Sequence, residues 1–134
     1  MEMLVNIDVD DLAKAVVFYR DALALHEERR LSGGSVVEMT GASSKIHLLR
    51  KAPGSAALSN APVYRTYRRH WTPVHLDFLV ADIEAAVNRA VSAHAKLEGE
   101  IQAFNWGRLA TLSDPFGHGF CLIQFVGKGY DEIA

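Results

Sequence analysis

Two amphipathic helices are predicted by the spacing of apolar residues along the chain. Apolar side chains recur every third or fourth position after Asp11 and again after Asp82, which places one apolar stripe on each helix. The stripes consist of Leu12, Ala15, Val16, Tyr19, Ala22 and Leu23, and of Ile83, Ala86, Val87, Ala90 and Val91. Each aspartate stands just before its stripe, where a carboxylate accepts hydrogen bonds from free backbone N–H groups. Asp11 and Asp82 are therefore predicted N-caps.

Short apolar runs bounded by turn residues predict the strands around these helices. One strand precedes each helix, and a hairpin of two strands follows it. The predicted strands cover residues 4–9, 35–39 and 45–50 in the first half, and residues 74–80, 109–113 and 119–126 in the second. The second hairpin turns at Asp114-Pro115-Phe116-Gly117-His118, where we expect Asp114 to bond the turn backbone and His118 to face solvent.

The two halves repeat one another. Residues 9–16 match residues 80–87 at an offset of 71, with identities at four positions, and the hairpins match at an offset of 74. Self-similarity of this kind indicates a duplicated structural unit. We expect one module over about residues 1–52, another over about residues 71–134, and between them a linker rich in small and turn-forming residues.

Composition places the chain among ordinary single-domain proteins. It has 134 residues, of which 49% are hydrophobic, and a formal net charge of -2. This charge gives no general attraction for nucleic acid or for an anionic membrane. No run is long and apolar enough to span a bilayer, the first residues are acidic rather than signal-like, and Cys121 has no second cysteine to pair with. These features predict a cytoplasmic protein without nucleic-acid or membrane partners.

Basic residues gather at the end of the linker, at Arg65, Arg68, Arg69 and His70. A phosphate-binding patch is one interpretation of this cluster. A solvated charged loop is the interpretation that composition favours, because aromatic and basic residues do not alternate on a predicted sheet face.

The motifs together resemble the vicinal oxygen chelate superfamily, which includes glyoxalase I, extradiol dioxygenases, fosfomycin-resistance enzymes and bleomycin-binding proteins. The motifs are Val9-Asp10-Asp11-Leu12 with Phe18-Tyr19-Arg20-Asp21, His75-Leu76-Asp77-Phe78-Leu79-Val80-Ala81-Asp82, and Asp114-Pro115-Phe116-Gly117-His118-Gly119-Phe120-Cys121. The resemblance covers nearly the whole chain and is strongest to the glyoxalase-like subgroup. It implies an α+β fold in which two βαβββ modules curl into a half-barrel cup around a small-molecule ligand, often as a homodimer.

The resemblance also implies where a metal would bind. Metal-dependent relatives take ligands from the first and last strands of each module, and these positions correspond here to Leu4, His47, His75 and Cys121. Leucine cannot ligate, and the remaining three include no carboxylate. We therefore predict no bound metal, and retain as the alternative a divalent metal held by His47, His75 and Cys121, a donor set that suits zinc.

Other chemistry in the cup would depend on imidazoles and aromatic walls. His75 and His47 are the candidate catalytic residues, because a neutral imidazole can act as a general base. The candidate ligand-binding residues are His47, His75, Trp71, Trp106, Arg108 and Cys121. Three of these residues also have a purely structural interpretation: Cys121 as a small buried apolar residue, Arg108 as a solvated cation, and His75 as the partner of Asp77 on the same strand face.

Three functions remain open at this level. The first is a metal-independent protein that binds a small molecule, or a lyase or isomerase without a metal. The second is a metal-dependent lyase or dioxygenase, and the third is a drug-sequestering resistance protein like the bleomycin-binding proteins. The superfamily alone does not choose among them.

Overall fold

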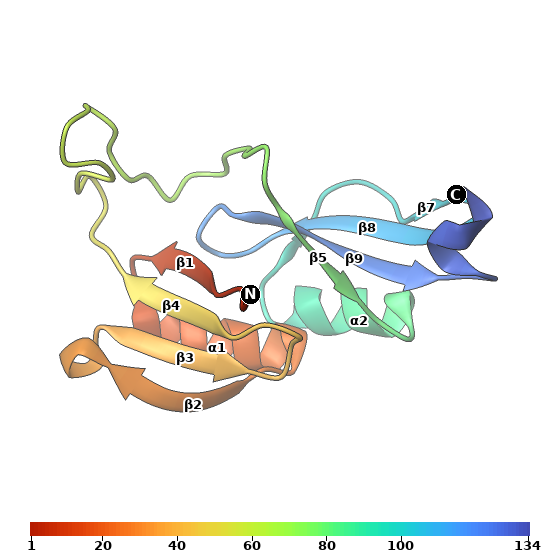
Figure 1. Ribbon diagram of the computed structural model, residues 1–134, viewed down its shortest axis with the longest axis horizontal. Helices are drawn as coiled ribbons and strands as arrows, with labels where there is room; N and C mark the ends of the chain where they lie inside the picture. Colours follow the sequence, from red (N-terminus) through yellow and green to blue (C-terminus); the bar gives the residue numbers. More distant parts are fainter. The chain divides into compact units, whose positions relative to one another are not determined.

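A computed structural model describes all 134 residues, which form two compact units, Met1–Arg68 and Arg69–Ala134. Each unit is a mixed sheet with one α-helix across one of its faces (Figure 1). The α+β fold class expected from the sequence is confirmed.

Unit 1 contains a four-stranded sheet in the order β1-β4-β3-β2, in which β1 and β4 are parallel and the other pairs are antiparallel. Its elements are β1 Val5–Val9, α1 Leu12–Leu23, β2 His26–Leu31, the 3₁₀ turn η1 Ser32–Gly34, β3 Val36–Thr40 and β4 Ile46–Arg50.

Unit 2 repeats this plan in the strand order β5-β9-β8-β6, with the short strand β7 also paired to β8. Its elements are β5 Leu76–Leu79, α2 Ile83–Ser92, β6 Lys96–Leu97, β7 Gln102–Ala103, β8 Gly107–Ser113, β9 Gly119–Phe125 and the 3₁₀ turn η2 Gly129–Glu132. Strands β5 and β9 are parallel, like β1 and β4.

Both helices begin as predicted. The Asp11 carboxylate accepts a hydrogen bond from the Lys14 amide at 3.0 Å, and the Asp82 carboxylate accepts one from the Ala85 amide at 3.1 Å. Most of each apolar stripe faces its sheet, whereas Val91 of the second stripe is 45% exposed. Tyr19 is buried as expected, and so is its neighbour Phe18.

The alternation of side chains along each strand separates a core face from an open face. In unit 1, the core face carries fully buried residues of β3 and β4 such as Val37, Met39 and Leu48. Glu38 and His47, which alternate with them, therefore lie on the face turned away from α1. In unit 2, Thr111 and Cys121 occupy the corresponding face, because their neighbours in sequence are the buried core residues.

Register refines the predicted repeat. Cys121 lies 74 residues after His47, whereas its partner Thr111 lies 73 residues after Glu38, the partner of His47. The single offset of 74 expected for the hairpins is therefore wrong for their first strand, because the connection of the second hairpin is one residue longer.

Three strands escaped the sequence pattern. Strand β2, with the sequence His-Glu-Glu-Arg-Arg-Leu, lies at the edge of its sheet and is mostly exposed, so it lacks an alternating apolar face. Strands β6 and β7 have only two residues each, which is too short for any periodicity.

The basic linker end is not simply solvated, as had been expected. Arg65 is mostly buried and donates to Asp8 at 2.7 Å, and it also donates to the backbone oxygen of Ala56 at 2.6 Å. Arg69 pairs with Glu98 at 2.7 Å. The burial of Arg65 corrects the solvated-loop interpretation at that position, whereas Arg69 is paired but exposed.

No helix in the structure has the length and apolar character needed to cross a membrane.

Candidate functional site

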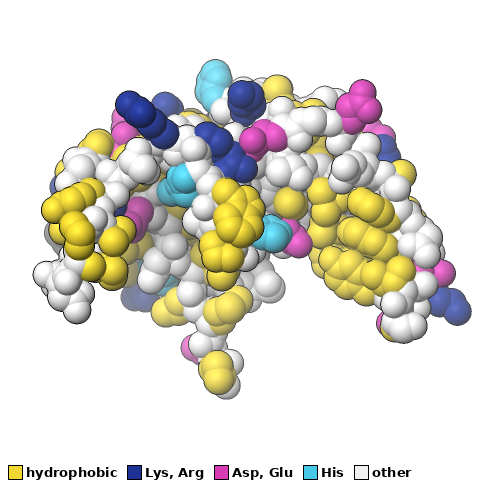
Figure 2. All heavy atoms as spheres, turned by 90° about the horizontal axis from the view of Figure 1, so that it is seen from above, with side chains coloured by type: hydrophobic (Ala, Val, Ile, Leu, Met, Phe, Trp, Pro, Cys, Tyr) yellow, Lys and Arg dark blue, Asp and Glu magenta, His cyan; other side chains and the backbone are white.

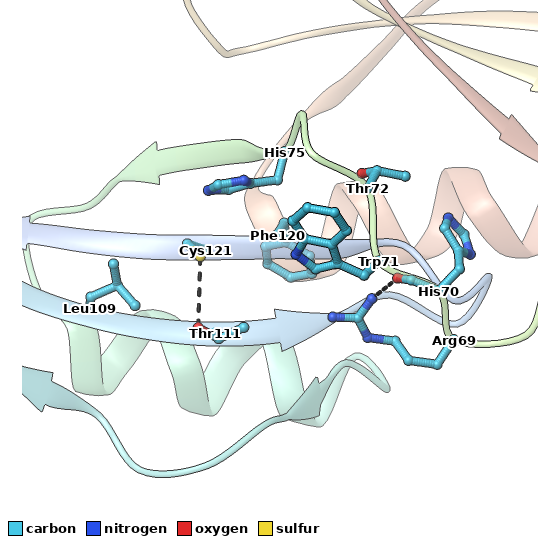
Figure 3. A pocket seen from close by; sticks show the side chains of 10 residues that line it. Arg69, His70, Trp71, Thr72, His75, Leu109, Thr111, Phe120 and Cys121 are labelled. Carbon is cyan, nitrogen blue, oxygen red and sulfur yellow. Dashed lines mark hydrogen bonds between the residues drawn. The ribbon is translucent and has the colours of Figure 1, made fainter.

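A pocket of about 320 Å³ lies in unit 2, between the open face of the sheet and the segment that precedes β5 (Figure 3). We call residues 69–72 the strap, since they form one wall of this pocket. The pocket is lined by Arg69, His70, Trp71, Thr72, His75, Leu109, Thr111, Gly119, Phe120 and Cys121.

The strap is held by hydrogen bonds to the turn between β8 and β9. The His70 amide donates to the Gly117 carbonyl at 3.2 Å, and His70 Nε2 lies 3.1 Å from His118 Nδ1. His118 is half-buried and contacts the strap, so the expectation that it faces solvent is wrong. Asp114 accepts from the amides of Phe116 and His118, as predicted for a turn aspartate.

Gly119 makes room for this arrangement. A Cβ atom at Gly119 would lie 2.7 Å from Nη2 of Arg69, a distance that side-chain carbons do not tolerate. The absence of a side chain lets the Arg69 guanidinium lie against β9 while its Nε donates to Glu98 at 2.7 Å. Arg69 thus fixes the strap at the edge of the pocket.

The floor of the pocket comes from alternate residues of β8 and β9. Leu109 and Thr111 point to the open face, and Thr111 lies directly opposite Cys121 in the antiparallel pair. The Thr111 hydroxyl is 3.8 Å from the Cys121 sulfur. Burial raises the pKa of the Cys121 thiol, and the nearby carboxylate of Asp77 raises that pKa further. The sulfur is therefore a neutral thiol at neutral pH.

His75, Asp77 and Cys121 form a cluster at the pocket, whose lining includes His75 and Cys121. The parallel register places Asp77 opposite Cys121, and His75 lies directly before β5, two residues ahead of Asp77. His75 Nε2 lies 3.2 Å from Asp77 Oδ1, as expected for a strand pair. One donor atom from each of the three residues lies within 4.8 Å of the others.

This cluster includes a carboxylate that the expected metal ligands lacked. Imidazole nitrogen, carboxylate oxygen and thiolate sulfur are all zinc ligands, so the three residues fit a divalent cation chemically. His75 and Cys121 belong to the predicted set, and within unit 2 Asp77 lies beside them as a further donor. His47 lies in unit 1, where its Nε2 atom is 3.0 Å from the buried carboxylate of Glu38.

Of the two candidate tryptophans, only Trp71 lines the pocket. Trp71 lies on the strap, lines the pocket and is 79% exposed. Trp106 belongs instead to an aromatic group with Phe104, Phe125 and Tyr130, stacking on Phe104 at a centroid distance of 5.1 Å. Hydrophobic side chains gather into a broad surface patch in Figure 2, and three members of this aromatic group are more than one-third exposed.

Arg108 also lies away from the pocket. It alternates with Leu109 and so points to the face that α2 covers, where its guanidinium pairs with Glu84 at the start of that helix. The pairing lowers the pKa of Glu84 and raises that of Arg108. We therefore assign Arg108 to the attachment of α2 rather than to ligand recognition.

Sequence reasoning named Trp71 but missed the fold of the strap that carries it, and it missed Glu38. The strap lies in an irregular segment, where periodicity carries no information. Glu38 did leave a signal, because a carboxylate inside the run Val36-Val37-Glu38-Met39 breaks an otherwise apolar strand.

Comparison with known proteins identifies the family of the chain. The glyoxalase-like domain family matches residues 4–123 of the chain. A protein of Mycobacterium bovis, named only as an uncharacterized protein, is 30% identical over 93% of this chain and 84% of its own length.

Solved structures agree in fold. The fosfomycin resistance protein FosX of Listeria monocytogenes matches with a TM-score of 0.75 at 15% identity, over 100% of this chain and 98% of its own. A glyoxalase family protein of Bacillus cereus matches with a TM-score of 0.70 at 24% identity, over 95% of both chains. The chain belongs to the glyoxalase-like domain family, within the vicinal oxygen chelate superfamily.

Proposed function

We propose that this protein binds a small organic molecule in the unit 2 pocket without the help of a metal, either as a binding protein or as a lyase or isomerase. The observation that carries the proposal is the exposed indole of Trp71 standing over a largely apolar floor. An aromatic ring left in solvent beside a concave surface gains apolar contact when a ligand covers it. A ligand with a flat apolar part suits this wall.

The polar groups of the pocket suit proton transfer to or from such a ligand. When His75 donates its Nε2 proton to Asp77, its Nδ1 atom is an acceptor for a ligand proton. The Thr111 hydroxyl and the neutral Cys121 thiol are weaker partners that orient rather than attack. The proposed chemistry is therefore proton abstraction beside a carbonyl, with His75 as the base and Asp77 as its positioning residue.

The first prediction concerns Trp71. A panel of aromatic and carbonyl-containing compounds is screened by thermal shift, since a ligand that binds the native state raises the melting temperature. For any ligand found, Trp71→Ala is expected to weaken affinity by about tenfold or more, the loss that follows from about 1.5 kcal/mol of aromatic contact.

The matched control is Tyr64→Ala, which removes an exposed aromatic residue from unit 1. Its affinity is expected to equal that of the unaltered protein. Equal affinities for all three proteins would contradict the assignment of the ligand to this pocket.

A metal-dependent lyase or dioxygenase is the second candidate, favoured by the convergence of His75, Asp77 and Cys121. These three residues would hold the ion, and the ion would polarise a ligand oxygen as a Lewis acid. Thiol deprotonation would accompany binding, because the charge of the ion would outweigh the burial and the Asp77 carboxylate that raise the pKa of Cys121.

Cobalt titration separates the two candidates. The metal-dependent candidate predicts one bound Co²⁺ per chain with a sulfur charge-transfer absorption that is absent in Cys121→Ser and weakened in Asp77→Asn. Asp131→Asn, an exposed change in the terminal turn, is the control. Our leading proposal predicts no stoichiometric binding, so a tight Co²⁺ complex would overturn its metal-independent part.

Drug sequestration enters through the comparison with the fosfomycin resistance protein. Antibiotics therefore belong in the ligand panel, and tight binding without turnover would assign the protein to that role. The superfamily resemblance further supports a cytoplasmic homodimer as the working form, which sedimentation of the purified chain would test.

A further inference from the structure

The lining of the unit 2 pocket contains one permanent charge. Arg69 is the only lining residue whose side chain stays charged at every ordinary pH, and no lining residue is acidic. The carboxylates of Asp77 and Glu98 lie outside the lining, and each is paired, Asp77 with His75 and Glu98 with Arg69. A cation in a concave surface that no carboxylate lines suits an anionic group.

The Arg69 guanidinium is held by two of its three nitrogens. Nε donates to Oε1 of Glu98 at 2.7 Å, and Nη1 donates to the backbone oxygen of His70. Glu98 is itself attached to the sheet, because its backbone amide donates to the Thr111 carbonyl at 2.8 Å. The guanidinium is therefore oriented before a ligand binds, so little side-chain freedom remains to be lost.

The third nitrogen, Nη2, makes no hydrogen bond with the protein. It lies against β9, where a Cβ atom at Gly119 would be 2.7 Å away. The Arg69 side chain is 38% exposed, so it is accessible from the solvent. Because the N–H groups of a guanidinium only donate, those on Nη2 are available to an acceptor that enters the pocket.

Arg69 and Trp71 project from the same short strap toward strands β8 and β9 (Figure 3). The indole offers a wall for a flat apolar group, and the guanidinium offers charged donors in the same pocket. A ligand that satisfies both residues joins a flat apolar body to an anionic acceptor.

We infer that the ligand of this pocket is a flat carboxylic acid whose ionised carboxylate accepts hydrogen bonds from Nη2 of Arg69. Glu98 is the positioning residue that orients Arg69 for this contact. The inference rests on the proposed function, because it names the ligand class of the same pocket.

A singly charged carboxylate suits the pocket better than a doubly charged phosphate. Glu98 already offsets the charge of Arg69, and only one guanidinium nitrogen is free. The Asp77 carboxylate, next to the lining residue Cys121, would repel a second negative charge.

Probes that differ in charge but share a flat ring test the contact. The affinities of naphthalene-2-carboxylate and naphthalene-2-carboxamide for the full chain are measured at neutral pH by titration calorimetry or ligand-observed NMR. We expect the acid to bind about tenfold more tightly than the amide, because its hydrogen bond to Arg69 is charge-assisted at both ends. 2-Naphthyl phosphate is the third probe, and tighter binding of the phosphate than of the acid would contradict the choice of a carboxylate.

Arg69→Gln should abolish the preference for the acid. The readout is the ratio of the two affinities, since a displaced strap would weaken both probes alike. Arg89→Gln removes the same charge from an exposed position on α2, which covers the opposite face of the sheet, and is expected to keep the ratio. A preference that survives in Arg69→Gln would overturn the inference.

Two variants of Glu98 test its positioning role. Glu98→Ala and Glu98→Gln both lose the negative charge, but only glutamine keeps an oxygen that can accept from Nε of Arg69. The ratio is expected to be about threefold lower in Glu98→Ala than in Glu98→Gln, because a freed side chain must be ordered on binding. Equal ratios in the two variants would show that Glu98 does not position Arg69.

The possible results distinguish this inference from the function on which it rests. Equal binding of the acid and the amide, weakened for both in Trp71→Ala, would overturn the carboxylate and leave the pocket assignment standing. No binding of any of the three probes would show that the ligand class is wrong, and the wider ligand panel with Trp71→Ala would then decide the proposed function by itself.

Discussion

At the scale of single residues, the group that depends most on its neighbours is the buried carboxylate of Glu38. Burial penalises a charge, and here Arg29, His47 and Lys45 offset that penalty, so the pKa falls to about 2 instead of rising. Such a group stabilises the folded chain only while its carboxylate is ionised.

Acid should therefore destabilise the protein through Glu38. In the unfolded chain this carboxyl takes a proton near its ordinary pKa of 4.5, whereas in the folded chain it does so only near 2. Its stabilisation is complete above the higher value and is lost as the pH falls between the two. Denaturant unfolding at a series of pH values is expected to show a shallower acid decline for Glu38→Gln. An unchanged decline would contradict the ionic network.

Residue patterns predicted part of the candidate site. The pairing of His75 with Asp77 followed from strand alternation, and the resemblance placed Cys121 on the neighbouring strand. The strap residue Trp71 was proposed as a wall and does line the pocket, but nothing in the sequence fixes how an irregular segment folds back. The ion-pair partners of Glu38 could not be predicted either, because a charged residue in a strand does not show which cationic side chains will contact it.

At the scale of elements, two aspartate caps set where the helices begin. Asp11 holds the Lys14 amide and Asp82 holds the Ala85 amide, at equivalent positions of the two units. Both were predictable because caps are local. Strand β2 was not, since an exposed edge strand needs no apolar alternation and its sequence is polar, so only its pairing with β3 identifies it as a strand.

Removing a cap should weaken the fold modestly. Asp11→Ala is expected to lower the free energy of unfolding by about 1 kcal/mol, because the first turn of α1 loses a hydrogen bond and a favourable dipole interaction. Asp10→Ala changes the adjacent exposed aspartate and is the control. Chemical denaturation checks both, and equal losses for the two variants would show that the cap contributes nothing specific.

At the scale of the whole molecule, duplication gives one plan two different uses. Each unit presents an open sheet face, but unit 1 carries an ionic row around Glu38 and His47, whereas unit 2 carries His75, Asp77, Cys121 and a strap. Leu4 of the first repeat occupies the position that His75 has in the second. It is exposed, and its side chain has no atom that could form a hydrogen bond or coordinate a metal. The fold could be predicted because the same pattern of strand, helix and hairpin occurs twice in the sequence. The polar groups of the two open faces could not, because the two repeats carry different residues at these positions.

The central claim is that a ligand covers Trp71, and the two tryptophans of the chain allow a direct measurement. Trp106→Phe leaves Trp71 as the sole indole, and Trp71→Phe leaves Trp106 as the matched control. Fluorescence titration with a ligand that raises the melting temperature should change the emission of the Trp71-only protein in a saturable way and leave the Trp106-only protein nearly unchanged. A saturable change confined to Trp106, or none at Trp71, would contradict the assignment of the pocket.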